Sequence, residues 1–204
     1  MPLSKLDHKR AITHLKKDKV LAKIIAKHEA LVWAKPGDLF ADIVENIIGQ
    51  QLSAGPTKII TKRFIDLFKT KKFPTPKQII TMPDQKIRDC GMSWAKVKYV
   101  KELSRMVQNK ELDLEKVKTL PDEEVIIELT KVKGIGRWTA EMVLIFYLQR
   151  PDVFSLGDLG LRTAVAKLYK VSRDDLKKIA KISASWSPYR SLASRYLWKS
   201  LDNK

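Results

Sequence analysis

One carboxylate, Asp158, stands where a fixed negative charge can do chemistry. It follows the apolar pair Val153-Phe154 and a break at residues 155–157, and it comes just before a run with helical apolar spacing. An aspartate at such a point is also a common helix N-cap, and the two interpretations are compatible. Backbone N–H donors and the helix dipole both favour the anion, so we expect this side chain to stay ionised. A fixed anion stabilises developing positive charge, such as an oxocarbenium-like sugar during cleavage of an N-glycosidic bond.

A glycine-bracketed turn precedes this carboxylate. Gly134 and Gly136 flank one hydrophobic residue, Ile135, between two stretches with helical spacing. Glycine is favoured where the backbone takes positive φ or approaches another segment closely. A helix predicted over 136–148 would begin with unpaired N–H groups and the positive end of its dipole, which together suit a phosphate. A single GxG fits an ordinary turn between helices equally well, so this interpretation depends on the rest of the chain.

The charge balance points to a polyanion as partner. The 204 residues include 40 Lys and Arg against 23 Asp and Glu, a formal net charge of +17. Because of this net charge, nucleic acid is the expected partner of the chain as a whole. Individual lysines, including Lys96, Lys98 and Lys101, are expected on the solvated surface.

The sequence lacks the residues that other classes of catalytic site need. A single cysteine, Cys90, excludes an internal disulfide framework, a multi-cysteine zinc site and a four-cysteine iron–sulfur cluster, and we expect it to be a buried structural residue. The histidines, His8, His14 and His28, all lie in the first 28 residues, away from any acidic cluster, which argues against a Ser-His triad or a histidine metal site. No phosphate-binding glycine motif of a nucleotide cofactor is present. Of the catalytic groups considered, only a carboxylate remains.

No apolar run approaches the roughly 18 residues that a membrane span needs, and the longest is residues 142–148. The basic N-terminus lacks the continuous apolar core of a signal peptide. We therefore expect a soluble intracellular protein with no membrane partner, located in the cytoplasm with the nucleoid in a prokaryote or in the nucleus in a eukaryote.

Helical signals run along the whole chain. Asp38 can cap a helix whose apolar positions have 3.6-residue spacing, and Thr75-Pro76 resembles a cap with proline in the first turn. Ser172 with Asp175 is predicted to form a capping box, and Ser187-Pro188 to start the last helix. No convincing alternating strand pattern is present, so the predicted fold class is all-α.

Four segments, in the same order, resemble the helix-hairpin-helix DNA glycosylase superfamily, and within it the 3-methyladenine (alkylation-repair) branch. They cover most of residues 40–198: FADIVENIIGQQLSAGPT (40–57), FPTPKQIITMPDQKIRDCGMSWAKVKYVKEL (73–103), the hairpin-to-aspartate segment (132–158) and WSPYRSLASRYLW (186–198).

The resemblance implies two helical lobes with the active-site cleft between them. Residues 1–44 with 152–204 are expected to form a terminal lobe. Residues 45–151 are expected to form a central lobe that contains the helix-hairpin-helix motif at about 130–148.

The resemblance also assigns roles. Asp158 falls on the family's catalytic aspartate, which stabilises the sugar cation or directs water to the anomeric carbon. The family's phosphate clamp and nearby DNA contacts fall on Gly134, Ile135, Gly136, Arg137 and Thr139. Backbone carbonyls near Thr130, Val132 and Ile135 fall where relatives hold a monovalent cation, Na⁺ or K⁺, which would bridge to DNA and take no part in the chemistry. No cofactor is expected to be required.

Trp138 bears on the reaction type. Relatives that also nick the DNA backbone carry a lysine there, whose amine forms a Schiff base with the sugar. A tryptophan cannot do so, which implies base release by hydrolysis alone. The alternative for Trp138 is a core residue at the first turn of a helix. Met142 stands where some relatives have a tyrosine, and we expect it to line the base pocket.

Trp198 is assigned to the same pocket by an argument from the sequence itself. Its helical neighbours at i−3, i−4 and i−7 are Arg195, Ser194 and Ser191, a small polar stripe, so a cleft is a better location for this ring than a core. Bases taken out of the DNA stack are held between aromatic faces, and a cationic alkylpurine gains further attraction from the π-cloud. Trp138 and Trp198 are the predicted walls.

Two adjacent amides, Gln50-Gln51, end an apolar helix. They can form a solvated helix C-terminus, or, as the resemblance implies, Gln51 can be the wedge that fills the space left by a flipped nucleotide.

The resulting hypothesis is a monomeric, monofunctional glycosylase. It would remove 3-methyladenine and 7-methylguanine from double-stranded DNA and leave an abasic site. Two alternatives remain open: a glycosylase for deaminated or mismatched bases such as hypoxanthine or uracil, and a non-catalytic DNA-binding module.

Overall fold

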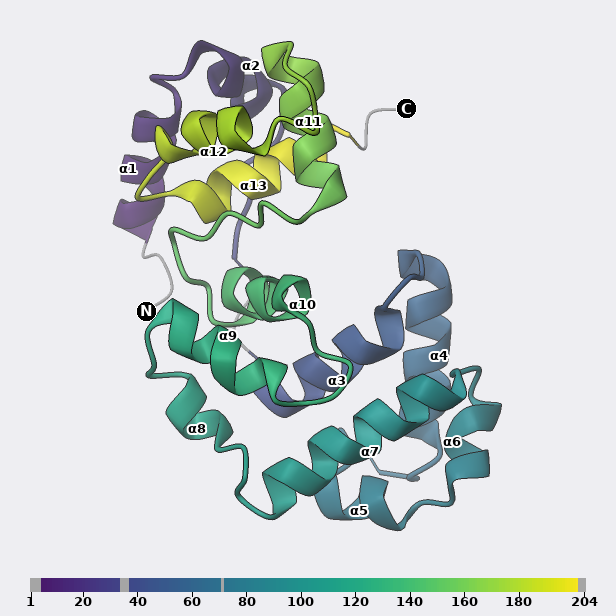
Figure 1. Cartoon of the computed structure of the whole chain (residues 1–204). Helices are drawn as coiled ribbons and strands as arrows, with labels where there is room; N and C mark the ends of the chain where they lie inside the picture. The colour runs from purple at the N-terminus through teal and green to yellow at the C-terminus, as the bar shows by residue number, and fades with distance from the viewer. Residues whose placement is uncertain (1–4, 34–36, 71, 202–204) are drawn as a thin grey trace. The chain divides into compact units, whose positions relative to one another are not determined.

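The computed structural model describes residues 5–33, 37–70 and 72–201, and all of their regular secondary structure is helical (Figure 1). The elements are, in order, α1 (Lys5–Leu15), α2 (Lys19–Lys27), α3 (Leu39–Gly49), α4 (Ala54–Asp66), α5 (Pro76–Thr81), α6 (Asp84–Asp89), α7 (Trp94–Gln108), α8 (Leu114–Val117), α9 (Asp122–Thr130), α10 (Arg137–Met142), a π-helical turn η1 (Val143–Tyr147), α11 (Leu159–Tyr169), α12 (Leu176–Ala184) and α13 (Arg190–Lys199). The predicted all-α class is confirmed. Within these residues, no helix has the length and apolarity needed to cross a bilayer.

Local hydrogen bonds explain where several helices begin. The carboxylate of Asp38 accepts the N–H of Phe40 at 3.0 Å and caps α3, as predicted. Thr75 caps α5 in a reciprocal capping box with Gln78, and Pro76 occupies the first turn. Both caps follow from side chains that satisfy backbone donors a few residues away.

The predicted first residues of two helices, α12 and α13, were wrong. Ser172 does not cap α12: its hydroxyl accepts the N–H of Asp174 at 3.2 Å, within the preceding turn. Asp175 is the cap, because its carboxylate accepts the N–H of Lys178 at 3.0 Å. The last helix begins at Arg190, because a turn hydrogen bond from Tyr189 N–H to the Trp186 carbonyl, at 2.8 Å, still occupies the residues before it.

The helix predicted over 136–148 is interrupted. After α10 the backbone widens into the π-helical turn η1, which extends to Tyr147. The apolar spacing of this stretch predicted continuous helix because no residue type distinguishes a π-turn from an α-turn.

The chain divides into two compact units, Met1–Lys35 with Leu144–Lys204, and Pro36–Val143. The boundaries expected from the sequence, 44/45 and 151/152, differ from this division. Helix α3 packs along its length on α4 and α7, so it belongs to the second unit as a whole. The stretch from Leu144 onward, within η1, belongs to the first.

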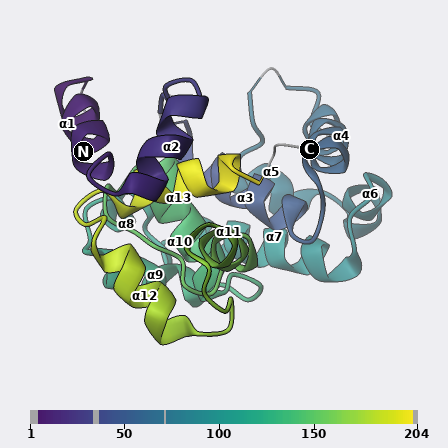
Figure 2. The same cartoon turned by 90° about the horizontal axis from the view of Figure 1, so that it is seen from above.

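The first unit is built on α2, α11 and α13, and Figure 2 shows α11 and α13 side by side. Asp18 connects its parts: one carboxylate oxygen accepts from Tyr169 Oη at 2.8 Å and from Trp186 Nε1 at 3.1 Å, and the other accepts backbone N–H groups at the start of α2. Burial opposes ionisation of Asp18, but the hydrogen bonds from Trp186, Tyr169 and the backbone outweigh it and lower the pKa below the ordinary value. Trp186 thus has a structural role in this unit.

Candidate active site

Asp158 is the N-cap of α11, and its carboxylate is fixed by two donors. Oδ1 accepts the backbone N–H of Leu161 at 2.6 Å and the indole N–H of Trp198 at 3.0 Å. The residue is 8% exposed. The cap interpretation is therefore confirmed, and the buried carboxylate is held in one orientation.

The segment that leads to Asp158 is tied to the start of α13. Arg190 binds Asp152 through Nε at 2.7 Å and Nη2 at 3.0 Å. The Ser191 hydroxyl accepts the N–H of Val153 at 2.9 Å and donates to the carbonyl of Arg150 at 2.6 Å. Burial alone would raise the pKa of Asp152, but hydrogen bonds from Arg190 and Ser187 lower it. This network sets the path of the chain into the site.

The Trp198 side chain contacts the Asp158 carboxylate, but the polar stripe beside it does not line a cleft as the sequence analysis predicted. Ser191 and Ser194, two members of its polar stripe, are fully buried, so the stripe faces packed structure and not a cleft. The half-buried Trp198 ring instead stacks on Phe146, with centroids 5.6 Å apart and an interplanar angle of 28°. Its N–H is directed to Asp158.

Phe146 is a site residue that the sequence reasoning missed. It is 41% exposed although it lies in the longest apolar run of the chain. A long apolar run is typical of core positions, but Phe146 lies within the π-helical turn η1 and part of its ring is exposed.

The other predicted pocket and DNA-contact residues lie in the second unit. Trp138, in the first turn of α10, is 43% exposed, so it is not a core tryptophan. Met142 and Thr139 are 6% and 4% exposed. The Thr139 side chain is therefore packed inside the unit, and it does not present a DNA contact on the surface.

The two hairpin glycines differ. Gly134 has φ +93°, and a Cβ atom there would lie 2.2 Å from Cδ2 of Tyr99, so the turn requires glycine. Gly136 has φ −92°, and a Cβ atom would meet nothing within 4 Å. Ile135 is 4% exposed, and its N–H donates to the Val132 carbonyl at 3.0 Å. The plugged turn predicted from the sequence is confirmed, but only one glycine is needed for conformation.

Arg137, predicted to contact DNA, is already engaged by two carboxylates. Its guanidinium donates to Glu123 through Nη2 at 2.6 Å and Nη1 at 3.0 Å, and through Nε to Glu141 at 3.0 Å. The hydrogen bond to Glu123 is the main reason that the pKa of Arg137 is raised. A phosphate would have to compete with these carboxylates.

The loop after α3 presents Gln51 at the surface. Gln51 is exposed and has φ +59°, and the adjacent Leu52 is 40% exposed. Gln50 is not a solvated amide, since its Nε2 donates to the Gly134 carbonyl at 2.8 Å. Leu52 is a second residue that the sequence reasoning missed: an exposed leucine beside the expected wedge is the type of side chain that intercalates between bases.

Not all of the named lysines are solvated surface residues. Lys96 donates from Nζ to the carbonyls of Ile48 and Gln50, both at 2.7 Å, and Lys101 forms an ion pair with Asp84. Lys98 is exposed, as expected. Cys90 is free and 4% exposed, which confirms a buried cysteine. Among the described residues, no group of three or more His, Cys, Asp or Glu side chains is arranged to hold a metal ion.

Comparisons with known proteins agree with the resemblance. Residues 44–188 match the family model described as HhH-GPD superfamily base excision DNA repair protein. DNA-3-methyladenine glycosylase 1 of Schizosaccharomyces pombe is 32% identical over 187 residues, which cover 89% of this chain and 80% of that protein. A Bacillus subtilis relative is also 32% identical, over 188 residues that cover 89% of this chain but 66% of the relative.

A solved structure of the S. pombe 3-methyladenine DNA glycosylase in complex with abasic DNA superposes with a TM-score of 0.84 at 29% identity and covers 94% of this chain and 96% of that one. Sequence and fold thus give the same classification. The chain belongs to the HhH-GPD superfamily of base excision DNA repair proteins.

Proposed function

We propose that this protein is a monofunctional DNA glycosylase that hydrolyses the N-glycosidic bond of alkylated purines in double-stranded DNA. Its substrates are 3-methyladenine and 7-methylguanine, and its product is an abasic site for base excision repair. The observation that carries the proposal is the fixed carboxylate of Asp158, bound by Leu161 N–H and by the Trp198 indole. The relatives support it, since one is named DNA-3-methyladenine glycosylase 1 and a solved one holds abasic DNA.

Asp158 acts by stabilising charge. When the bond between the sugar and the base breaks, its electron pair leaves with the base, and the sugar becomes oxocarbenium-like. The carboxylate offsets this positive charge, and water then adds to the anomeric carbon and loses a proton. An N3- or N7-alkylated purine carries a positive charge and leaves as a neutral base, so the reaction needs no dedicated general acid. Fixed opposing charge typically contributes about 10²–10³ in rate.

In this proposal Trp138 and Trp198 each provide an aromatic face for the flipped base, and Met142 provides an apolar side chain. Both indoles retain accessible surface, 43% of Trp138 and part of the half-buried Trp198. A cationic base is attracted to indole faces by roughly 0.5–2 kcal/mol. Because position 138 carries no amine, no Schiff base forms and the DNA backbone is not cut.

Binding of the duplex relies on net charge and on the hairpin. The formal charge of +17 attracts the phosphate backbone without regard to sequence. The N–H groups around Gly134 and Gly136 contact one phosphate, and Gln51 enters the duplex. The carbonyls of Thr130, Val132 and Ile135 are hard oxygen donors that fit a monovalent cation, which would supply positive charge beside that phosphate. The protein acts as a monomer.

A panel of duplexes tests the substrate class. Purified protein is incubated with DNA that contains 3-methyladenine, 7-methylguanine, hypoxanthine or uracil, and free bases and alkali-labile abasic sites are measured. We expect release of both methylated purines and no strand cleavage before alkali treatment. Release of uracil or hypoxanthine alone would assign the protein to deaminated bases. Salt-sensitive binding with no release from any duplex would identify a DNA-binding module.

A further inference from the structure

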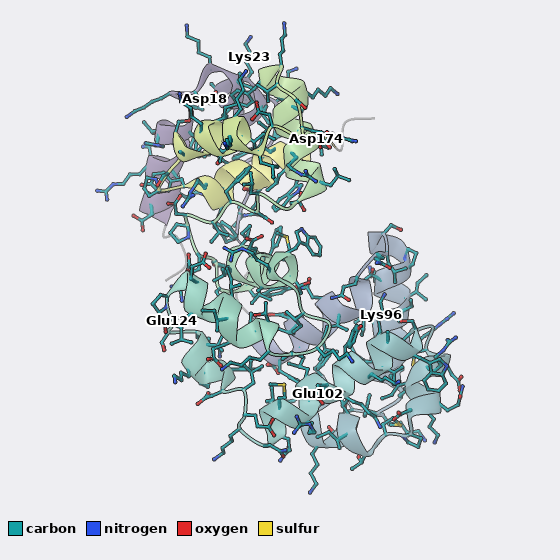
Figure 3. The ribbon with its side chains drawn as sticks, viewed as in Figure 1. Asp18, Lys23, Lys96, Glu102, Glu124 and Asp174 are labelled. Carbon is teal, nitrogen blue, oxygen red and sulfur yellow. The ribbon has the colours of Figure 1, made fainter. Side chains whose placement is uncertain are left out.

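Three side-chain hydrogen bonds in the second unit connect the Gln51 loop to α7 and to the hairpin. Lys96, which is labelled in Figure 3, lies on α7. Its Nζ donates to the carbonyls of Ile48 and Gln50 at 2.7 Å each. Nε2 of Gln50 donates to the carbonyl of Gly134 at 2.8 Å. The bonds join segments that are 46 to 84 residues apart in sequence, so they reflect tertiary packing and not local geometry.

The Lys96 ammonium occupies a site suited to a cation. The last carbonyls of a helix lack partners in the helix and lie at the negative end of its dipole. Hydrogen bonds from a charged donor to these groups are shorter and stronger than neutral ones. Lys96 is half-buried there, and burial lowers the pKa of its ammonium. A lysine with no role at this point would extend into water, as the exposed Lys98 does.

Gln51 is bracketed by this network. On one side, the Gln50 carbonyl is held by Lys96 at 2.7 Å; on the other, the N–H of Leu52 donates to the Gly49 carbonyl at 3.0 Å. Gln51 itself has φ +59°, a left-handed conformation that is unfavourable for a residue other than glycine. The backbone is therefore held in an unfavourable conformation that presents an exposed amide.

The hairpin is fixed to the same helix. Gly134, whose carbonyl accepts from Gln50, is covered by the ring of Tyr99, one turn after Lys96 on α7. Helix α7 thus sets the positions of the Gln51 loop and the hairpin through residues three apart. Small errors in such positions are costly, because a displacement of about 1 Å can reduce a rate about 10²-fold.

We propose that Lys96 is a positioning residue for base flipping, which holds Gln51 at a fixed separation from the hairpin that grips the DNA backbone. The inference rests on the proposed function, in which Gln51 fills the space of the extruded nucleotide. Lys96 touches neither the base nor the sugar; it acts through the Gln50 carbonyl on the residue that follows.

A double-mutant cycle tests whether Lys96 acts through Gln51. Lys96→Met keeps the apolar stem and removes the donors, and Lys98→Met makes the same change of charge two residues away. We expect Lys96→Met to slow single-turnover release of 3-methyladenine about tenfold, because Gln51 is then no longer held in the geometry that insertion needs. Lys98→Met should stay within about twofold. In a Gln51→Ala background, Lys96→Met should have almost no further effect. An equal factor in both backgrounds, or equal effects of the two lysine variants, would overturn the proposal.

A second readout does not depend on catalysis. Each protein is bound to a duplex with a tetrahydrofuran abasic analogue opposite 2-aminopurine, whose fluorescence reports insertion beside it. We expect the wild type to change the fluorescence, Lys96→Met to lose most of that change, and both lysine variants to bind the duplex with similar affinity. The positioning role would be refuted if Lys96→Met changed the fluorescence as much as the wild type does, or if the wild type did not change it. Absence of base release by the wild type would refute the proposed glycosylase alone.

A conservative variant, Lys96→Arg, keeps the test possible if Lys96→Met does not fold. If Lys96→Met is unfolded by circular dichroism, Lys96→Arg replaces it in the same cycle, because a guanidinium keeps the charge but not the geometry of the ammonium. We expect a loss of about threefold that again disappears in the Gln51→Ala background. Additive effects in that cycle would contradict the proposal.

Discussion

Trp198 and Asp158 are joined side chain to side chain, with the indole N–H donating to the carboxylate at 3.0 Å. The same oxygen accepts the N–H of Leu161, so one carboxylate atom fixes both the start of α11 and the orientation of the indole. The ring that we propose to hold the base and the anion that we propose to stabilise the sugar are therefore positioned together.

Trp198→Phe separates the two roles of this tryptophan. Phenylalanine keeps an aromatic face for stacking on Phe146 but removes the donor to Asp158. A hydrogen bond to a charged group contributes roughly 1.5–3 kcal/mol, so we expect single-turnover release of 3-methyladenine to slow by about tenfold or more. The same lost hydrogen bond should also lower the melting temperature by several degrees. A rate within twofold of the wild type would show that the hydrogen bond has no part in catalysis.

Gly160→Ala tests the spacing around the carboxylate. A Cβ atom at this position would lie 3.1 Å from Oδ1 of Asp158 and 3.3 Å from the Trp198 ring. We expect displacement of one of these groups and a release rate about tenfold lower. Gly157→Ala is the control, because a Cβ atom there meets nothing within 4 Å. Equal rates for the two variants would mean that the site tolerates the added methyl group.

Gly134→Ala tests the hairpin. Its φ of +93° and the 2.2 Å approach to the Tyr99 ring both exclude a side chain. The left-handed conformation and the steric overlap together should lower the free energy of unfolding by about 2–4 kcal/mol. Gly136→Ala, with a negative φ and open space, should change it by less than about 1 kcal/mol. Denaturant titration of both variants measures the difference, and similar values would contradict the described turn.

Asp42 makes stability depend on pH. Burial, followed by the nearby charges of Glu45 and Asp38, raises its pKa from 3.8 to about 6 in the folded protein. The folded state then binds a proton more tightly than the unfolded state, so this group's stabilising contribution is present at low pH and is lost as the pH rises from about 4 to about 6. Asp42→Asn should raise the melting temperature at pH 8 and leave it nearly unchanged at pH 4. A variant less stable than wild type at pH 8 would contradict this sign.

Local signals in the sequence predicted the fold well. The caps at Asp38 and Thr75 involve side chains and backbone groups two or three residues apart, so residue type and spacing are enough to place them. Gly134 was predicted for the correct reason, since its positive φ is a local property. A competing acceptor explains the wrong cap, because the Asp175 carboxylate accepts the N–H of Lys178 and the helix begins three residues later than a Ser172 cap would place it.

Contacts between distant residues could not be predicted in the same way. The bond from Trp198 to Asp158 spans 40 residues, and those from Lys96 span 46 and 48. Nothing in the type of Lys96 distinguishes it from the exposed Lys98 on the same helix. Trp198 contacts Asp158, but the sequence placed its polar stripe in a cleft and the structure buries that stripe, because helical spacing says which residues share a face and not what covers it.

The most direct test compares Asp158→Asn with the wild type in single-turnover release of 3-methyladenine from methylated duplex DNA. Asparagine is an equally good N-cap and retains an oxygen that can accept from Leu161 and Trp198, so the fold and the melting temperature should be preserved while the negative charge is lost. The account predicts release at least about 100-fold slower than by the wild type. Equal rates for a folded Asp158→Asn protein would contradict it.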